Sequence, residues 1–76
     1  MAYHMIFVRD GSQWSPQFGD SDRECVNQER IDTYLGERGM RFEGDGKYAS
    51  KDIKIVTFKR TPNQAAIVAQ TAELNR

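Results

Sequence analysis

The stretch that decides the fold is YHMIFVRDGSQWSPQF, residues 3–18. Apolar side chains alternate between the two faces of the strand that we expect over residues 3–9. They are Tyr3, Met5 and Phe7 on one face, and Ile6 and Val8 on the other. Apolar residues on both faces favour a strand that lies inside a sheet, or one that is covered on both sides.

A β-hairpin is predicted by the dipeptide Asp10-Gly11 that follows. Such a dipeptide is a strong local signal, because a type I′ turn needs positive φ at both of its central residues. The chain would return as a second strand from Trp14 to Phe18, with Trp14, Pro16 and Phe18 on one face. Because proline has no N–H to donate to a ladder, we expect this strand at an edge of the sheet.

A helix is expected next, over residues 22–35. Ser21 and Glu24 have the spacing of a capping box at its start, and Gly36 is placed to end it in a left-handed conformation. After a glycine-rich segment, which is either a mobile loop or a short extra hairpin, residues 53–59 are rich in β-branched and aromatic residues. We expect this second strong strand to be the central one.

The last helix is expected after Thr61, where Pro62 suits the first helical position and Gln64 completes a second capping box. Small apolar residues along one face of this helix would allow close packing on a sheet or on another helix. They are Ala65, Val68, Ala69 and Ala72. The expected fold class is therefore α+β, with a three-stranded, mainly antiparallel sheet and two helices on one of its faces, in the order β-β-α-β-α.

The composition is that of one small globular domain over residues 1–76, with 38% hydrophobic and 29% charged residues. Eleven Lys and Arg balance eleven Asp and Glu, so the chain lacks the basic excess of a dedicated nucleic-acid binder. The single cysteine, Cys25, excludes an intramolecular disulfide and favours a cytoplasmic location. We expect no membrane association, because no apolar run approaches the length of a membrane span.

The chain shows no motif for catalysis, for a metal or for a cofactor. His4 lies inside an expected strand, and Cys25 has no histidine beside it, although a helix start could lower the pKa of its thiol. We expect Cys25 to be a structural, at least half-buried residue. The carboxylates at Asp20, Asp22 and Glu24 are explained by helix capping. The prediction is therefore a protein that is not an enzyme and that holds no metal and no cofactor.

Two surfaces are candidates for binding. The first is formed by Trp14 and Phe18, because an edge strand with large aromatic side chains can dock a protein partner. The ordinary alternative is that both pack beneath a helix. The second is a nucleic-acid surface, in which basic residues contact phosphates and aromatic residues stack on bases. Its members are Arg41, Phe42, Lys47, Tyr48, Lys54, Lys59 and Arg60. Neighbouring acidic residues dilute this surface, so a solvated strand and loop is its alternative.

A resemblance adds to this interpretation. Residues 14–31, WSPQFGDSDRECVNQERI, resemble a pattern in small uncharacterised proteins of tailed bacteriophages, in which a hairpin ending in W-x-x-Q-F-G-D runs into an acidic helix start. The β-β-α-β order is also similar to that of small phage proteins that inhibit host RNA polymerase, in architecture only. The resemblance implies an accessory protein that binds a host or phage protein in the host cytoplasm and modulates it.

Overall fold

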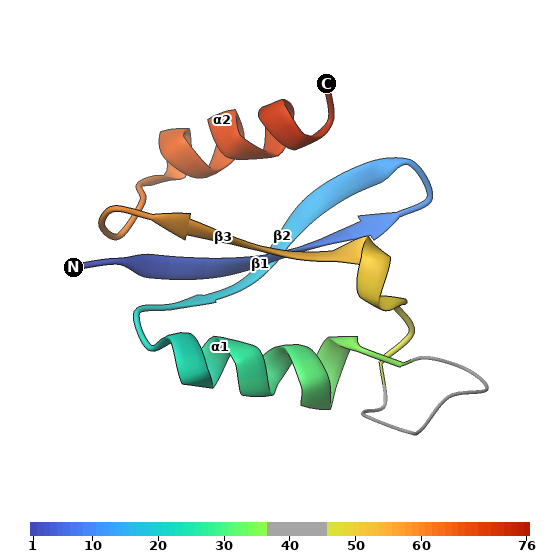
Figure 1. The fold of residues 1–76 in the computed structure, drawn as a ribbon. Coiled ribbons are helices and arrows are strands. Elements are labelled where there is room, and N and C mark those ends of the chain that lie inside the picture. Colours follow the sequence, from blue (N-terminus) through green and yellow to red (C-terminus); the bar gives the residue numbers. More distant parts are fainter. Residues whose placement is uncertain (37–45) are drawn as a thin grey trace.

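The computed structural model describes residues 1–36 and 46–76, and it confirms the expected α+β fold and the order β-β-α-β-α (Figure 1). A three-stranded antiparallel sheet lies between two helices. The strands are β1 (Tyr3–Asp10), β2 (Gln13–Asp20) and β3 (Ile53–Phe58). The two helices are α1 (Arg23–Glu29) and α2 (Gln64–Leu74). A π-helical turn extends α1 over Arg30–Tyr34, and a 3-10 turn at Ser50–Asp52 precedes β3.

The strand order is β2-β1-β3, so β1 is the central strand. The expectation that residues 53–59 form the central strand is wrong, whereas the expected edge position of β2 is confirmed. The reason lies in β1 itself, where five consecutive residues from His4 to Val8 are buried. Only a strand with neighbours on both sides and a helix on each face buries such a run.

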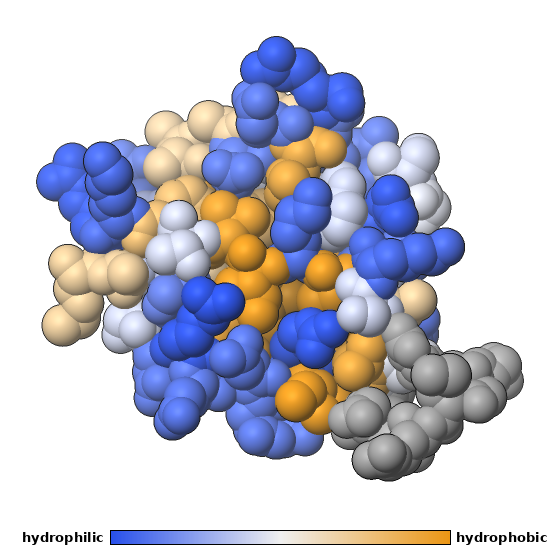
Figure 2. Space-filling view, in the orientation of Figure 1, coloured by the Kyte–Doolittle hydropathy of each residue, from blue (hydrophilic) through white to orange (hydrophobic). Residues whose placement is uncertain are grey.

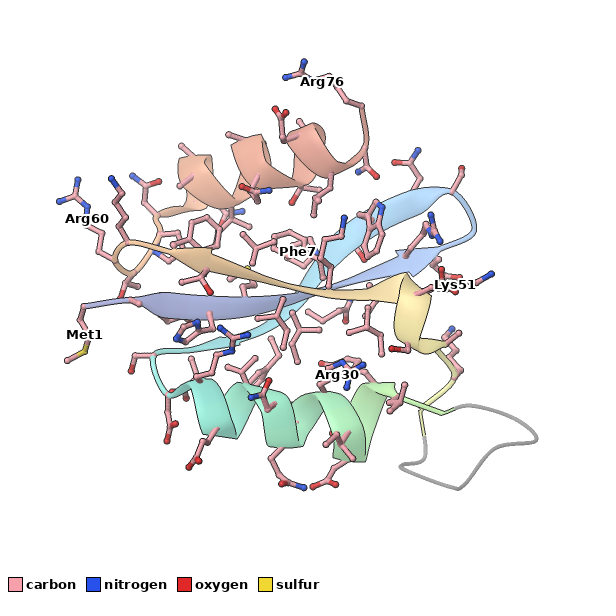
Figure 3. All side chains as sticks on the ribbon, in the orientation of Figure 1. Met1, Phe7, Arg30, Lys51, Arg60 and Arg76 are labelled. Atoms are coloured by element: carbon pink, nitrogen blue, oxygen red, sulfur yellow. The ribbon has the colours of Figure 1, made fainter. Side chains whose placement is uncertain are left out.

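The two helices lie on opposite faces of the sheet, and not on one face as expected (Figure 1). Each face of β1 therefore has its own core. Under α1 the buried residues are Ile6, Val8, Val26, Leu35 and Ile53. Under α2 they are Met5, Phe7 and Trp14, against which Ile67 and Leu74 of the helix pack, and Figure 3 shows Phe7 on this side of the sheet. The alternation of apolar residues in β1 thus serves two separate layers of side chains.

A β-bulge in β2 separates the two aromatic residues that were expected to share a face. Ile6 pairs with Phe18 and Phe7 pairs with Pro16, so Gln17 is the extra residue of the edge strand. An extra residue moves every side chain beyond it to the other face. Trp14 consequently packs in the α2 layer, and Phe18 packs in the α1 layer.

The hairpin turn is present, but its geometry differs from the expected type I′. Asp10 pairs with Gln13, so the two loop residues are Gly11 and Ser12. Gly11 has φ of 68°, and no other described residue has positive φ. A two-residue loop with positive φ at its first residue alone matches a type II′ turn, which places glycine at that position.

Both helix starts are shifted from the expected capping boxes. Asp22 caps α1, and its Oδ1 accepts hydrogen bonds from the backbone N–H groups of Glu24 (3.0 Å) and Cys25 (3.4 Å). Asn63 caps α2 by accepting from the N–H of Ala66 at 2.8 Å. Asp and Asn cap as well as Ser and Thr do, so these neighbours compete for the position. Gly36 is not left-handed either, because the chain leaves the helical region at Leu35 in extended conformation.

Candidate protein-binding surface

Helix α2 is apolar on the side that faces away from the sheet as well as on the side that faces it. Ile67 and Leu74 point to the sheet, while Val68 is 58% exposed. The face of small apolar residues that was expected to pack on a sheet or helix is exposed. It consists of Ala65, Val68, Ala69 and Ala72. A helix with apolar residues all round is typical of a buried position, so this exposed apolar face is unusual for a surface helix.

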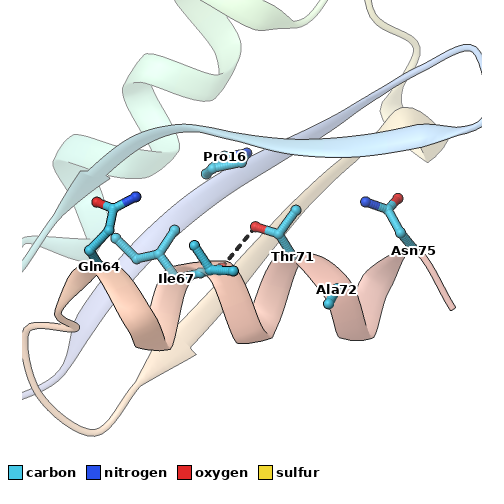
Figure 4. A pocket seen from close by; sticks show the side chains of 7 residues that line it. Pro16, Gln64, Ile67, Thr71, Ala72 and Asn75 are labelled. Atoms are coloured by element: carbon cyan, nitrogen blue, oxygen red, sulfur yellow. Dashed lines mark hydrogen bonds between the residues drawn. The ribbon is translucent and has the colours of Figure 1, made fainter.

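An apolar groove runs between this helix and the edge strand β2, with a volume of about 390 Å³ (Figure 4). It is lined by Pro16, Gln64, Ile67, Val68, Thr71, Ala72 and Asn75. Figure 4 shows Pro16 on the strand side, opposite Gln64, Ile67, Thr71 and Asn75 on the helix side. The bulge at Gln17 fixes this arrangement, because Pro16 pairs with Phe7 and so belongs to the α2 face.

The groove is closed at one end by a side-chain bridge between Asn75 and Trp14. The amide of Asn75 accepts from the backbone N–H of Trp14 at 2.6 Å and donates to its carbonyl oxygen at 3.1 Å. Two such bonds reproduce one pair of a β-ladder, so Asn75 occupies the free edge of β2 at this residue. The bridge joins positions that are 61 residues apart and holds α2 against β2.

Trp14, one of the two predicted partner-binding residues, is 8% exposed and belongs to the α2 core. Two cations lie over its ring, with the Arg9 guanidinium 5.2 Å and the Lys54 ammonium 4.9 Å from the ring centroid. Arg9 is also held by Asp52 through a hydrogen-bonded ion pair of 2.7 Å. Phe18, the other predicted residue, is half-buried against the α1 core. The structure therefore does not bring Trp14 and Phe18 together, and a partner-binding role for the pair stays a prediction.

The predicted nucleic-acid residues are spread over separate places. Lys47 lies at the hairpin end, where its ammonium is 3.8 Å from the Asp10 carboxylate and 5.4 Å from the centroid of the Tyr48 ring. Lys54 lies over Trp14, as described above. Lys59 and Arg60 follow β3 at the opposite end of the strand and line a second, more polar depression of about 380 Å³. Arg41 and Phe42 lie outside the described residues. Nucleic-acid binding through this set stays a prediction.

Cys25 is exposed, contrary to the expectation of a half-buried structural thiol. Its pKa is raised above the ordinary value, chiefly by desolvation and further by the negative charges of Asp20, Asp22 and Glu29. The position near a helix start therefore does not lower the pKa of this thiol, and a thiol with a raised pKa is a poor nucleophile at neutral pH. Over residues 1–36 and 46–76 no group of three or more His, Cys, Asp or Glu residues is placed to hold a metal.

Comparisons with protein-family models, curated proteins and solved structures find no match for this chain. None of the helices in the described part of the chain is long and apolar enough to cross a membrane. The functional proposal therefore rests on the surfaces of the described residues, where the groove beside α2 is more apolar than the depression at Lys59 and Arg60.

Proposed function

We propose that this protein acts by binding another protein, and that the partner docks in the groove between α2 and β2. The observation that carries the proposal is the apolar groove itself. Val68, which lines this groove, exposes more than half of its surface, and the rest of the lining is mainly apolar. Burying such surface favours association, by roughly 25 cal/mol for each Å² removed from water.

The groove is suited to an apolar anchor of the partner. Of its three polar side chains, the Thr71 hydroxyl donates to the carbonyl oxygen of Ile67 at 2.8 Å, and the Asn75 amide is engaged by Trp14. Each of these two groups already has a partner within the protein, so neither needs a ligand to satisfy it. Recognition would depend on the shape of one or two large apolar or aromatic side chains of the partner, which is typical of the energetic centre of an interface.

The kind of partner follows from the sequence. The resemblance of residues 14–31 to small proteins of tailed bacteriophages supports an accessory role, in which docking alters the activity of a host or phage protein. The absence of a catalytic motif in the sequence is in keeping with an action by binding alone. The raised pKa of the Cys25 thiol also weighs against covalent chemistry at that residue.

The test compares two lysine substitutions on adjacent exposed residues of α2. Val68→Lys places a charge in the groove, whereas Ala69→Lys places the same charge on the same helix outside the groove lining. Neither side chain is part of the core, so both variants should fold. Immobilised wild-type protein and the Ala69→Lys variant should capture the same proteins from a bacterial lysate, and Val68→Lys should lose them. Identical capture by all three proteins would refute docking in the groove.

A further inference from the structure

The two edges of the sheet differ in their capacity to accept another strand. Along β2, Pro16 has no N–H to offer, Gln17 is a bulge and the Asn75 amide occupies the backbone of Trp14. Proline, bulges and covered backbone groups are the devices by which proteins protect sheet edges. Among residues 1–36 and 46–76, none of these three devices protects the edge of β3 over Ile53–Phe58, and no described strand pairs with that edge.

The register identifies the backbone groups that β3 presents to this edge. Asp10 and Gln13 flank a two-residue loop and so form a hydrogen-bonded pair. The backbone N–H and C=O groups of the even-numbered residues of β1 therefore point to β2, and those of the odd-numbered residues point to β3. The β3 residues opposite these odd-numbered residues, such as Val56 opposite Met5, direct their backbone groups toward β1. Ile55 and Thr57 therefore direct their N–H and C=O groups outward, spaced for pairing with an extended chain.

Apolar side chains flank this edge on both faces. Helix α1 packs mainly against β1 and β2, and α2 packs mainly against β2, so Ile55 on the α1 face and Val56 on the α2 face stay half-buried. Figure 2 shows apolar surface between the two helices at the level of β3, surrounded by hydrophilic residues. Lys54 does not shield the edge, because its ammonium lies inward over the Trp14 ring at 4.9 Å.

The segment that contains β3 is basic although the chain as a whole is neutral. Residues 51–60 contain four basic residues, Lys51, Lys54, Lys59 and Arg60, against Asp52 alone, and Asp52 is neutralised by Arg9. Lys51 precedes the strand, while Lys59 and Arg60 follow it, so both ends of the edge are basic. A complementary ligand carries carboxylates at its two ends and apolar residues in between.

We propose that the free edge of β3 binds an extended acidic segment of a partner protein, which adds to the sheet as a fourth strand. A second copy of the chain fits less well, since it would bring a second basic segment against the first. A single-stranded nucleic acid would match the charge but not the outward N–H and C=O groups of Ile55 and Thr57. This edge is separate from the groove beside α2, so either surface can fail its test alone.

The experiment uses a fluorescently labelled peptide of alternating valine and threonine with two aspartates at each end, and a matched peptide with lysines in place of the aspartates. We expect saturable anisotropy changes with the acidic peptide only, weaker at higher salt. Lys59→Glu combined with Arg60→Glu, both exposed and outside the core, should weaken acidic-peptide binding roughly tenfold and allow the lysine peptide to bind.

A second variant tests the backbone pairing itself. Thr57→Pro removes an outward N–H without breaking the ladder to β1, but it also removes the hydroxyl that is hydrogen-bonded to His4 Nδ1 at 2.9 Å. Thr57→Val, which loses this hydroxyl and keeps the N–H, is therefore its control, and circular dichroism reports whether the sheet is kept. Loss of peptide binding with an intact sheet supports strand addition. Equal affinity for both peptides would overturn the proposal. A dimer that the Thr57→Pro substitution dissociates, but that the peptide does not dissociate, would also overturn it, because the edge would then bind a second copy. Tighter binding of an oligothymidine than of the acidic peptide would overturn it as well.

Discussion

The bridge between Asn75 and Trp14 gives the sharpest test of how α2 is held on the sheet. Replacing Asn75 with alanine removes two hydrogen bonds, of 2.6 and 3.1 Å, to the backbone of a residue that is 8% exposed. A net contribution of about 1 kcal/mol for each bond gives a loss of about 2 kcal/mol in the free energy of unfolding. For a domain of this size, that loss lowers Tm by roughly 10 °C.

The assay is urea unfolding followed by fluorescence, because Trp14 is the only tryptophan of the chain and lies at the bridge itself. Asn27→Ala is the matched control, since Asn27 is exposed on α1 and its truncation should change stability by less than about 0.5 kcal/mol. If Asn75→Ala unfolds at the same urea concentration as the control, the bridge does not hold α2, and the groove it closes has no fixed end.

Three further predictions concern the turn, the first helix and the thiol. Gly11→Ala should destabilise the protein by about 1 kcal/mol in thermal unfolding, because alanine is strained at φ of 68°; an unchanged Tm would contradict the turn geometry. Asp22→Ala should lower the free energy of unfolding by about 1 kcal/mol because it removes the N-cap, whereas Ser21→Ala should not change it measurably. The reverse order would support the capping box that the sequence predicts. The pH dependence of Cys25 alkylation by iodoacetamide should give a pKa above that of a free thiol. Asp20→Asn should lower this pKa and so speed the reaction at pH 8, and equal rates for the two proteins would show that the carboxylate has no influence.

The sequence predicted those parts of the fold that depend on local signals. The alternation of apolar residues in β1 and the hairpin after it need only neighbours in the chain, and both are confirmed, although the turn is not of the expected type I′. Pro16 placed β2 at an edge for a reason that holds in any sheet. The N-caps were missed by one or two positions because Asp22 competes with Ser21, and Asn63 with Thr61, on nearly equal terms.

Three-dimensional choices were not predictable in the same way. The alternation in β1 allows a helix on either face, so it did not decide that α1 and α2 lie on opposite sides. The bulge at Gln17 leaves no strong mark in the sequence, yet it separates Trp14 from Phe18. The sequence held one signal for the groove, which is the low charge of α2. Residues 64–74 contain a single charged residue, Glu73, so no face of this helix is strongly polar.

The position of β1 at the centre of the sheet also orders the steps by which the chain can fold. Its pairing with β2 needs only the short turn at Gly11, and hairpins of this kind form in about 1–10 μs. Its pairing with β3 joins Met5 to Val56, and this contact must close a loop that includes all of α1. The hairpin and α1 can therefore assemble early, whereas the α2 layer can form only after β3 has paired with β1, which is the slower step. During that interval the apolar face of Met5 and Phe7 is uncovered, so nascent or refolding chains should aggregate most readily before β3 arrives.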